Sequence, residues 1–256
     1  EHLLNSICCA LDMVIDSLPK TTFQTDDFCF VKKIATGSNS TIGLYDVNVT
    51  GRGLPAQVVL KIAESDLGAC KIEERTCGIA LFTKLMEEYL REIYFITIPP
   101  VSCLARIYGY SIDPLFVVME NFNGGSLFAL VHERHVKLPW KTKLLIGVQI
   151  ATAMEILHNG SIPLIHRDLK SPNVLMRLSE SGAYESCAVS DFGLTVPATG
   201  TNNGGDVECP FWLAPEVISG GSFTQKSDVY SFAIIMWELK TELIPFSEFN
   251  FCSVIR

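Results

Sequence analysis

The stretch of sequence that decides the fold runs from residue 166 to residue 173. It reads His166-Arg167-Asp168-Leu169-Lys170-Ser171-Pro172-Asn173 and directly follows the apolar run 162–165. A proline inside so polar a stretch predicts a loop. Phosphoryl transfer depends on positioning and charge compensation, so it requires a carboxylate, cations and oxygen ligands for a metal ion. Asp168, Lys170 and Asn173 supply one group of each kind.

This loop resembles the catalytic loop H-R-D-L-x-x-x-N of protein kinases. Lys170, two places after Asp168, is similar to the serine/threonine type of that loop. The resemblance implies that Asp168 orients the attacking hydroxyl, that Lys170 offsets charge on the transferred phosphate and that Asn173 binds magnesium. It also implies that His166 packs structurally against Phe192. A lone His-Arg-Asp is equally consistent with a functionless loop, so the other motifs decide.

Downstream motifs follow in the order typical of that family. Asp191-Phe192-Gly193 begins 23 positions after Asp168 and resembles D-F-G, which implies that Asp191 chelates magnesium. Residues 209–216 resemble T-P-x-W-M-A-P-E, with Cys209 in the usual place of threonine. Residues 226–239 resemble a buried helix, apolar nearly all round, whose Asp228 binds the backbone of the catalytic loop.

A lysine interrupts the apolar strand 57–61. Such a lysine requires a partner for its ammonium group. The strand resembles V-A-I-K, which implies that Lys61 grips the α- and β-phosphates of ATP. Residues 89–93 resemble the kinase αC helix and favour Glu92 as its partner, with Glu73 or Glu74 as rivals. Glu92 lies 31 positions after Lys61, which indicates a lengthened connection near residues 63–77.

The resemblance assigns the nucleotide site to residues from both halves of the chain. Residues 35–42 resemble the glycine-rich loop G-x-G-x-x-G-x-V, of which only the middle glycine, Gly37, is kept. In the strand that resembles V-A-I-K, Val59 replaces the alanine. The expected hinge after residue 119 offers backbone groups to adenine. The full set is Ala35, Gly37, Ser40, Ile42, Val59, Lys61, Met119, Glu120, Phe122, Leu175 and Asp191, with Asn173 and Asp191 as the magnesium ligands.

The expected fold is the α+β, two-lobed protein kinase fold. An N-terminal helical extension covers residues 1–23, and the kinase domain covers 24–256. Its N-lobe (24–119) is an antiparallel sheet with the αC helix. The hinge is 120–124, and the mostly helical C-lobe covers 125–256. The resemblance implies an arginine that pairs with Glu216 in a later helix, and that arginine is not found. We therefore expect that the C-lobe is incomplete or that the sequence is a fragment. ATP is expected between the lobes. Strands are predicted from Phe28 to about Val49 and around a turn at 109–114, and a long helix over 139–158.

Composition narrows the class of partner. The 256 residues carry a net charge of −8, which argues against nucleic acid and leaves protein substrates. Nine irregularly spaced cysteines indicate free thiols in a reducing, intracellular compartment. No run is long enough to cross a membrane, although the chain is also consistent with the cytoplasmic part of a receptor. Thr195, Thr199 and Thr201 are candidate phosphosites facing Arg167, or simply solvated threonines.

Two functions remain open on these grounds. The first is an active serine/threonine kinase, with dual specificity not excluded, that acts in signal transduction and is similar to the tyrosine-kinase-like group. The second is a pseudokinase, a binding or scaffold module of kinase fold, which Ala35, Ser40, Val59 and Cys209 favour. Retention of every charged catalytic position favours the enzyme.

Overall fold

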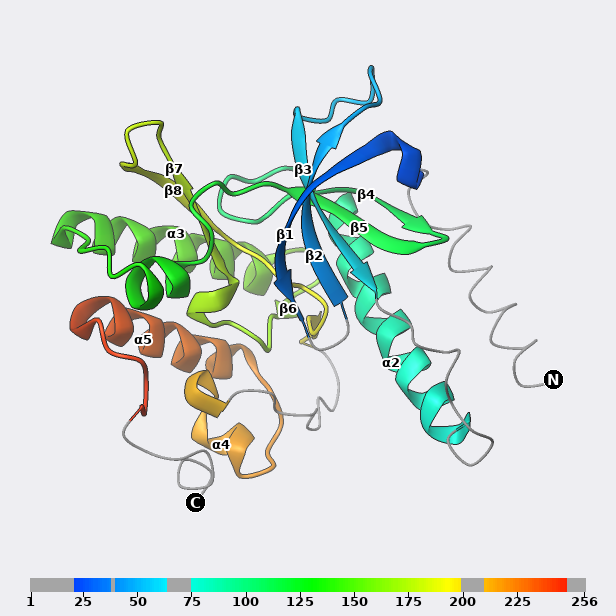
Figure 1. The fold of residues 1–256 in the computed structure, drawn as a ribbon. Coiled ribbons are helices and arrows are strands. Elements are labelled where there is room, and N and C mark those ends of the chain that lie inside the picture. The colour runs from blue at the N-terminus through cyan, green and yellow to red at the C-terminus, as the bar shows by residue number, and fades with distance from the viewer. Residues whose placement is uncertain (1–20, 38–39, 64–74, 199–209, 248–256) are drawn as a thin grey trace. The chain divides into compact units, whose positions relative to one another are not determined.

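A computed structural model describes residues 21–37, 40–63, 75–198 and 210–247 (Figure 1). The chain forms two compact units, Glu1–Pro99 with Arg106–Asn121 and Pro100–Ala105 with Phe122–Arg256, and each is described by itself. The predicted N-terminal helix, the lengthened connection after Ala63 and Cys209 lie outside the described residues. Residues 100–105 were expected in the first lobe. They belong to the second unit, because Ala105 and Cys103 exchange backbone hydrogen bonds with Val189.

The first unit is built on a five-stranded antiparallel sheet in the order β1-β2-β3-β5-β4. The strands are β1 (Phe28–Thr36), β2 (Ser40–Val47), β3 (Gln57–Ala63), β4 (Ile107–Ile112) and β5 (Leu115–Glu120), with short 3-10 turns η1 (Thr25–Asp27) and η3 (Phe95–Thr97). The predicted strands between Phe28 and Val49 are confirmed. The predicted turn at 109–114 was too long, because pairing of β4 with β5 continues to Ile112 and leaves only Asp113-Pro114 to turn.

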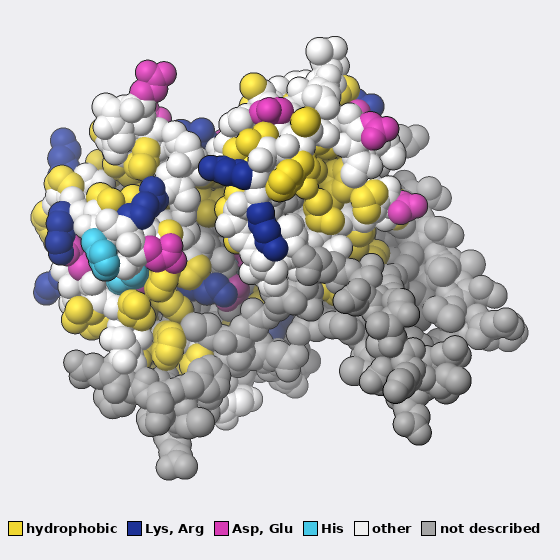
Figure 2. Space-filling model, in the orientation of Figure 1, with side chains coloured by type: hydrophobic (Ala, Val, Ile, Leu, Met, Phe, Trp, Pro, Cys, Tyr) yellow, Lys and Arg dark blue, Asp and Glu magenta, His cyan; other side chains and the backbone are white. Residues whose placement is uncertain are grey.

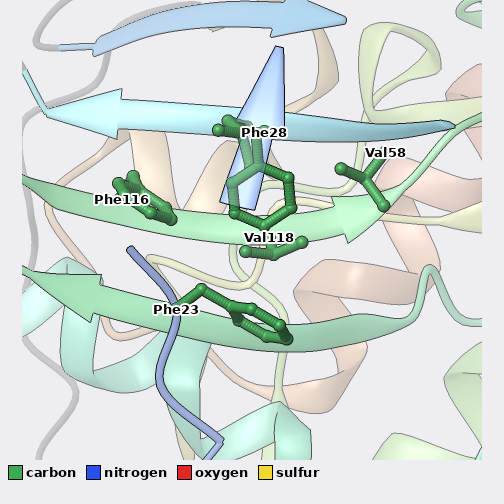
Figure 3. Packing of buried hydrophobic residues seen from close by; sticks show 6 residues of the cluster. Phe23, Phe28, Val58, Phe116 and Val118 are labelled. Carbon is green, nitrogen blue, oxygen red and sulfur yellow. The ribbon is translucent and has the colours of Figure 1, made fainter. Parts of the chain in front are cut away.

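Aromatic side chains fill the core on one face of this sheet (Figure 3). The rings of Phe28 and Phe116 meet edge to face with centroids 6.0 Å apart, and Phe23 lies 5.6 Å from Phe28. Val58 and Leu60 from β3 and Val118 from β5 complete the cluster. Because side chains alternate along a strand, the neighbours of these residues are left for the opposite face.

Helix α2 (Arg75–Tyr94) belongs to the first unit and is held by a buried tyrosine. Met86, Tyr89 and Ile93 are buried at helical spacing. The Tyr89 hydroxyl lies against two backbone carbonyls, those of Ser111 on β4 and of Phe116 on β5, the latter at 3.1 Å. Burial raises the pKa of Tyr89, so the hydroxyl keeps its proton. The tyrosine thereby fixes where the last turns of α2 lie.

The second unit is mainly helical. Its long helices α3 (Trp140–Asn159) and α5 (Gln225–Thr241) pack against each other (Figure 1). The predicted helix over 139–158 is confirmed. Short elements are β6 (Leu164–Ile165) with β9 (Val196–Pro197), β7 (Val174–Leu178) with β8 (Tyr184–Val189), the π-helical turn η4 (Ala129–Glu133), the 3-10 turns η5 (Ser171–Asn173) and η6 (Pro210–Trp212), and α4 (Pro215–Ile218).

Helix α5 corrects an expectation. It was predicted to be surrounded by protein because it is apolar nearly all round. Instead Val229 is 58% exposed and Trp237 41%, whereas polar side chains are buried. The buried polar residues of α5 are Ser227, Asp228, Ser231 and Glu238. The physical reason is that the polar side chains of α5 accept hydrogen bonds from buried donors, such as the backbone N–H groups of His166 and Arg167. The polar face of the helix is therefore buried, and some of its apolar side chains are exposed to solvent.

Surface composition is mixed on the face drawn in Figure 2. Acidic and basic side chains are interspersed there, and hydrophobic side chains also reach the surface. Among the described residues, no helix is both long enough and apolar enough to cross a membrane.

The sheet core provides a test of the fold. Phe116→Ala should lower the free energy of unfolding by about 3–5 kcal/mol, because the buried ring leaves a cavity. Phe30→Ala, on the same sheet but 58% exposed, should change it by less than about 1 kcal/mol. Urea denaturation measures both, and equal losses would contradict the packing described.

Candidate active site

Asp168 lies at the centre of a short network within the loop 166–173. The Asn173 side-chain amide donates to both the Asp168 backbone carbonyl and its carboxylate, each at 2.8 Å. The Lys170 ammonium lies 2.8 Å from the same carboxylate, whose side chain is 22% exposed. Since these contacts fix the carboxylate without covering it, Asp168 can still accept a proton from a molecule that reaches it.

A buried aspartate holds the start of this loop. The Asp228 carboxylate accepts the backbone N–H groups of His166 at 2.9 Å and Arg167 at 3.0 Å. The predicted bond from Asp228 to the loop backbone is therefore confirmed. His158, at the end of α3, lies 2.8 Å from the same carboxylate, a contact that the sequence did not indicate. These bonds support Arg167 at φ 71°, a backbone conformation that costs a non-glycine residue free energy.

Asp191 lies within electrostatic range of Asp168. Burial raises the pKa of Asp168, Lys170 opposes this, and the charge of Asp191 raises it further. The loop segments are also tied together, because the Ser190 N–H and hydroxyl both donate to the Asn173 backbone carbonyl, at 2.9 and 3.0 Å. The second unit thus brings two carboxylates and the Asn173 amide into one neighbourhood.

This donor set fits a magnesium ion. The Asn173 amide nitrogen is directed at Asp168, which leaves its amide oxygen on the other side. That oxygen and the Asp191 carboxylate are the hard ligands that magnesium prefers, usually one or two protein groups completed by phosphate oxygens and water. No group of three or more His, Cys, Asp or Glu residues suited to a metal occurs among the described residues.

His166 is an interior side chain. It is fully buried, and its ring meets that of Phe192 at 5.7 Å between centroids and an interplanar angle of 62°. The predicted contact is confirmed, although the rings are tilted rather than stacked. The His166 Nδ1 accepts the Asp168 N–H at 3.2 Å, so the ring supports the loop.

In the first unit, Lys61 of β3 is paired with Glu92 of α2. The predicted pairing is confirmed, and the rivals Glu73 and Glu74 lie outside the described residues. The Glu92 side chain is 4% exposed and that of Lys61 24%. The lysine side chain therefore stays partly exposed, whereas its partner is almost fully removed from solvent.

Strand register gathers several predicted nucleotide residues on one face of the sheet. Ala35 pairs with Ile42, and Ile42 pairs with Lys61, so these side chains form one cross-strand row. Val59 pairs with Met119 in the next row of the same face. Gly37 closes the β1–β2 connection by donating its N–H to the Ser40 carbonyl at 2.7 Å.

The predicted hinge residues are divided between the units. Glu120 ends β5 in the first unit, with its N–H donating to the Arg106 carbonyl at 2.9 Å. Phe122 lies in the second unit, where it packs in one cluster with Leu175. Its carbonyl accepts the Gly125 N–H at 3.1 Å. The Glu120 N–H and the Phe122 carbonyl are thus already engaged, which reduces the backbone groups that this stretch offers to a ligand.

The candidate phosphosites are not supported equally. The Thr195 hydroxyl is buried and has no hydrogen-bond partner among the described residues, so it is inaccessible in this conformation and was a poor prediction. Thr199 and Thr201 lie outside the described residues. Arg167 lies over the Phe223 ring, 4.5 Å from its centroid.

Residues 30–255 match the family described as protein tyrosine and serine/threonine kinase. The chain belongs to that family. Three relatives come from Dictyostelium discoideum. The probable serine/threonine-protein kinase roco5 is 32% identical over 93% of this chain and 8% of that protein. Cyclic GMP-binding protein C is 36% identical over 66% of this chain and 6% of its own length. The probable serine/threonine-protein kinase roco9 is 33% identical over 82% of this chain and 6% of its own length. The chain thus spans less than a tenth of these relatives.

The Lys61–Glu92 pair can be tested for stability apart from function. Lys61→Met should lower the free energy of unfolding by about 1–3 kcal/mol, because it leaves the Glu92 carboxylate buried without that partner. Adding Glu92→Gln should recover part of this loss, because a neutral amide is less costly to bury. Chemical denaturation measures each variant. Glu87→Gln, 58% exposed on the same helix, is the control and should change little. A double variant less stable than Lys61→Met would contradict this.

Asp228 can be tested in the same way. Asp228→Asn should cost about 2–4 kcal/mol of unfolding free energy, since the amide nitrogen faces backbone donors that then lack an acceptor. The exposed Asp26→Asn serves as the control. If Asp228→Asn shifted the urea midpoint as little as Asp26→Asn does, the stability of the protein would not depend on the bonds of this carboxylate to the loop.

Proposed function

We propose that this chain transfers the γ-phosphoryl group of ATP to serine or threonine hydroxyls of protein substrates. The observation that carries the proposal is the arrangement in the second unit: Asp168 held by Asn173 and Lys170, with Asp191 close enough to raise its pKa. Family membership and relatives named as serine/threonine kinases support it. Lys170 in the loop supports serine or threonine, rather than tyrosine, as the acceptor.

Asp168 is the group that receives the substrate hydroxyl. Its partly exposed carboxylate accepts the hydroxyl hydrogen and orients the oxygen for in-line attack on the γ-phosphorus. The new bond joins that oxygen to phosphorus, and the bond from phosphorus to the oxygen bridging to the β-phosphate breaks, which releases ADP. The hydroxyl proton passes to Asp168 and then to solvent. Lys170 offsets negative charge beside the carboxylate.

The remaining polar residues bind the phosphates. Lys61, held by Glu92, contacts the α- and β-phosphates, with Ala35 and Ile42 of its own row and Val59 of the next row on the same face of the sheet. Asn173 and Asp191 would hold magnesium, which would neutralise phosphate charge when bound.

The wider assignments belong to the same proposal. The nucleotide base contacts Met119, Glu120, Phe122 and Leu175, and the chain comprises an N-terminal extension up to residue 23 followed by a kinase domain. Phosphorylation of intracellular proteins in signal transduction is the corresponding role.

The decisive variant is Asp168→Asn. Transfer of labelled phosphate from ATP to a generic protein substrate should fall at least about 100-fold, because the amide cannot take the hydroxyl proton. Thermal unfolding should show a folded protein whose stabilisation by Mg-ATP persists. Asp113→Asn, at an exposed turn, should retain full transfer.

The same measurements separate the enzyme from a scaffold of kinase fold. Stabilisation by Mg-ATP without any transfer by the unaltered chain would favour the scaffold, for which the bulk of Val59 and the loss of two loop glycines are the sequence grounds. Undiminished transfer by Asp168→Asn would refute the catalytic assignment.

A further inference from the structure

Glu238 is a buried carboxylate that none of the roles above uses. It lies near the end of α5 and is 2% exposed. Its Oε1 accepts the Ser171 hydroxyl at 2.7 Å and lies 3.0 Å from His132 Nε2, and its Oε2 accepts the Trp212 indole N–H at 2.7 Å. These three residues come from η5, η4 and η6, segments distant from one another in the sequence.

A carboxylate at this position needs a reason, because burial of a charge is costly. Burial raises the pKa of Glu238, and the contacts with Ser171, Trp212 and His132 lower it again. Three hydrogen-bonded contacts on two oxygens satisfy a group that has only acceptors. Removal of the side chain would leave buried donors unsatisfied in three segments at once.

One of the three segments is the site loop itself. Ser171 is buried and follows Lys170, whose ammonium touches the Asp168 carboxylate. Lys170 also accepts the Asn173 backbone N–H through its carbonyl at 2.9 Å, which closes the turn that contains Ser171. Ser171 is thus at the centre of the turn that carries Lys170 and Asn173, the two residues holding Asp168.

The other two contacts anchor Glu238 away from the loop. The Trp212 backbone carbonyl accepts the Ser231 hydroxyl of α5 at 2.7 Å, so Trp212 is attached to α5 twice. The Phe128 ring contacts both other rings, with its centroid 4.8 Å from that of His132 and 6.4 Å from that of Trp212. The carboxylate is therefore held by contacts that do not involve the loop, one on each of its oxygens.

We propose that Glu238 is a positioning residue for the phosphoryl transfer, acting through the Ser171 hydroxyl on Lys170, Asn173 and hence Asp168. The inference rests on the proposed function for its kinetic consequence and on geometry alone for its effect on the loop. It assigns to α5 a second attachment to the site loop, five residues beyond the attachment that Asp228 makes at His166.

The kinetic test uses Ser171→Ala, Glu238→Ala and the double variant. Each single variant should lower kcat about 10- to 100-fold, because misplaced catalytic groups cost rate. KM for ATP should change less than about twofold, because Lys61, the proposed contact of the α- and β-phosphates, is held by Glu92 within the first unit. If Glu238 acts through Ser171, the double variant should be no slower than Glu238→Ala. Full additivity of the two losses would overturn the proposal.

Glu238→Gln provides the conservative rescue. Its amide nitrogen can donate to Ser171 Oγ and to His132 Nε2, while its oxygen accepts the Trp212 N–H, so all three contacts persist. It should restore kcat to within about fivefold of the unaltered chain. Glu155→Ala, exposed on α3, should leave kcat unchanged. A glutamine variant as slow as the alanine variant would count against positioning.

Hydrogen exchange of the backbone amides gives a readout that needs no activity. Ser171→Ala and Glu238→Ala should both accelerate exchange across residues 166–173, whereas exchange in β3 of the first unit stays unchanged. Unchanged exchange in the loop would overturn the proposal even if the kinetics shifted. If the unaltered chain transfers no phosphate, the proposed function fails, and accelerated exchange would still establish that Glu238 positions the loop.

Discussion

The structure of the site depends on burying two carboxylates on one helix. Asp228 and Glu238 of α5 are almost fully covered, and together they contact two backbone amides, a serine, an indole and two histidines. An ionised carboxylate without water is stable only when its lone pairs are used. Each contact therefore holds a distant segment to the helix, and the loop 166–173 is bound near both of its ends.

This attachment explains how the loop can keep an unfavourable backbone conformation. Arg167 and Asp191 have positive φ angles of 71° and 66°, which non-glycine residues adopt only when the surroundings compensate. The Asp228 carboxylate receives the Arg167 N–H directly, and Ser190, next to Asp191, is bonded twice to the Asn173 carbonyl. The two residues with positive φ therefore lie at or next to backbone groups that are hydrogen-bonded to other segments.

Sequence patterns predicted this arrangement unevenly. The loop, the Lys61–Glu92 pair and the long helix before the loop follow from motifs and periodicity, which are local or flanked by recognisable residues. Glu238, His158 and Tyr89 were missed in these roles because their partners lie elsewhere in the chain: Ser171 precedes Glu238 by 67 positions, and His158 precedes Asp228 by 70. The exposure of Val229 was mispredicted for a related reason, since hydrophobic periodicity says nothing about donors on the loops that a helix meets.

In each unit a partly exposed charged side chain depends on a buried carboxylate. A group that meets a ligand has to stay partly exposed, yet a mobile charge is poorly placed for chemistry. Lys61 is 24% exposed against a Glu92 that is 4% exposed, and Asp168 is 22% exposed on a loop held by an Asp228 that is 2% exposed. The buried member bears the desolvation cost, and Glu92 lies on α2 one turn from Tyr89, whose hydroxyl donates to the Phe116 carbonyl of the sheet. In each pair one residue is exposed to meet a ligand, and a second, buried residue keeps it in place. Replacing the buried Glu92 or Asp228 should therefore disturb the position of Lys61 or Asp168 although those residues themselves are unchanged.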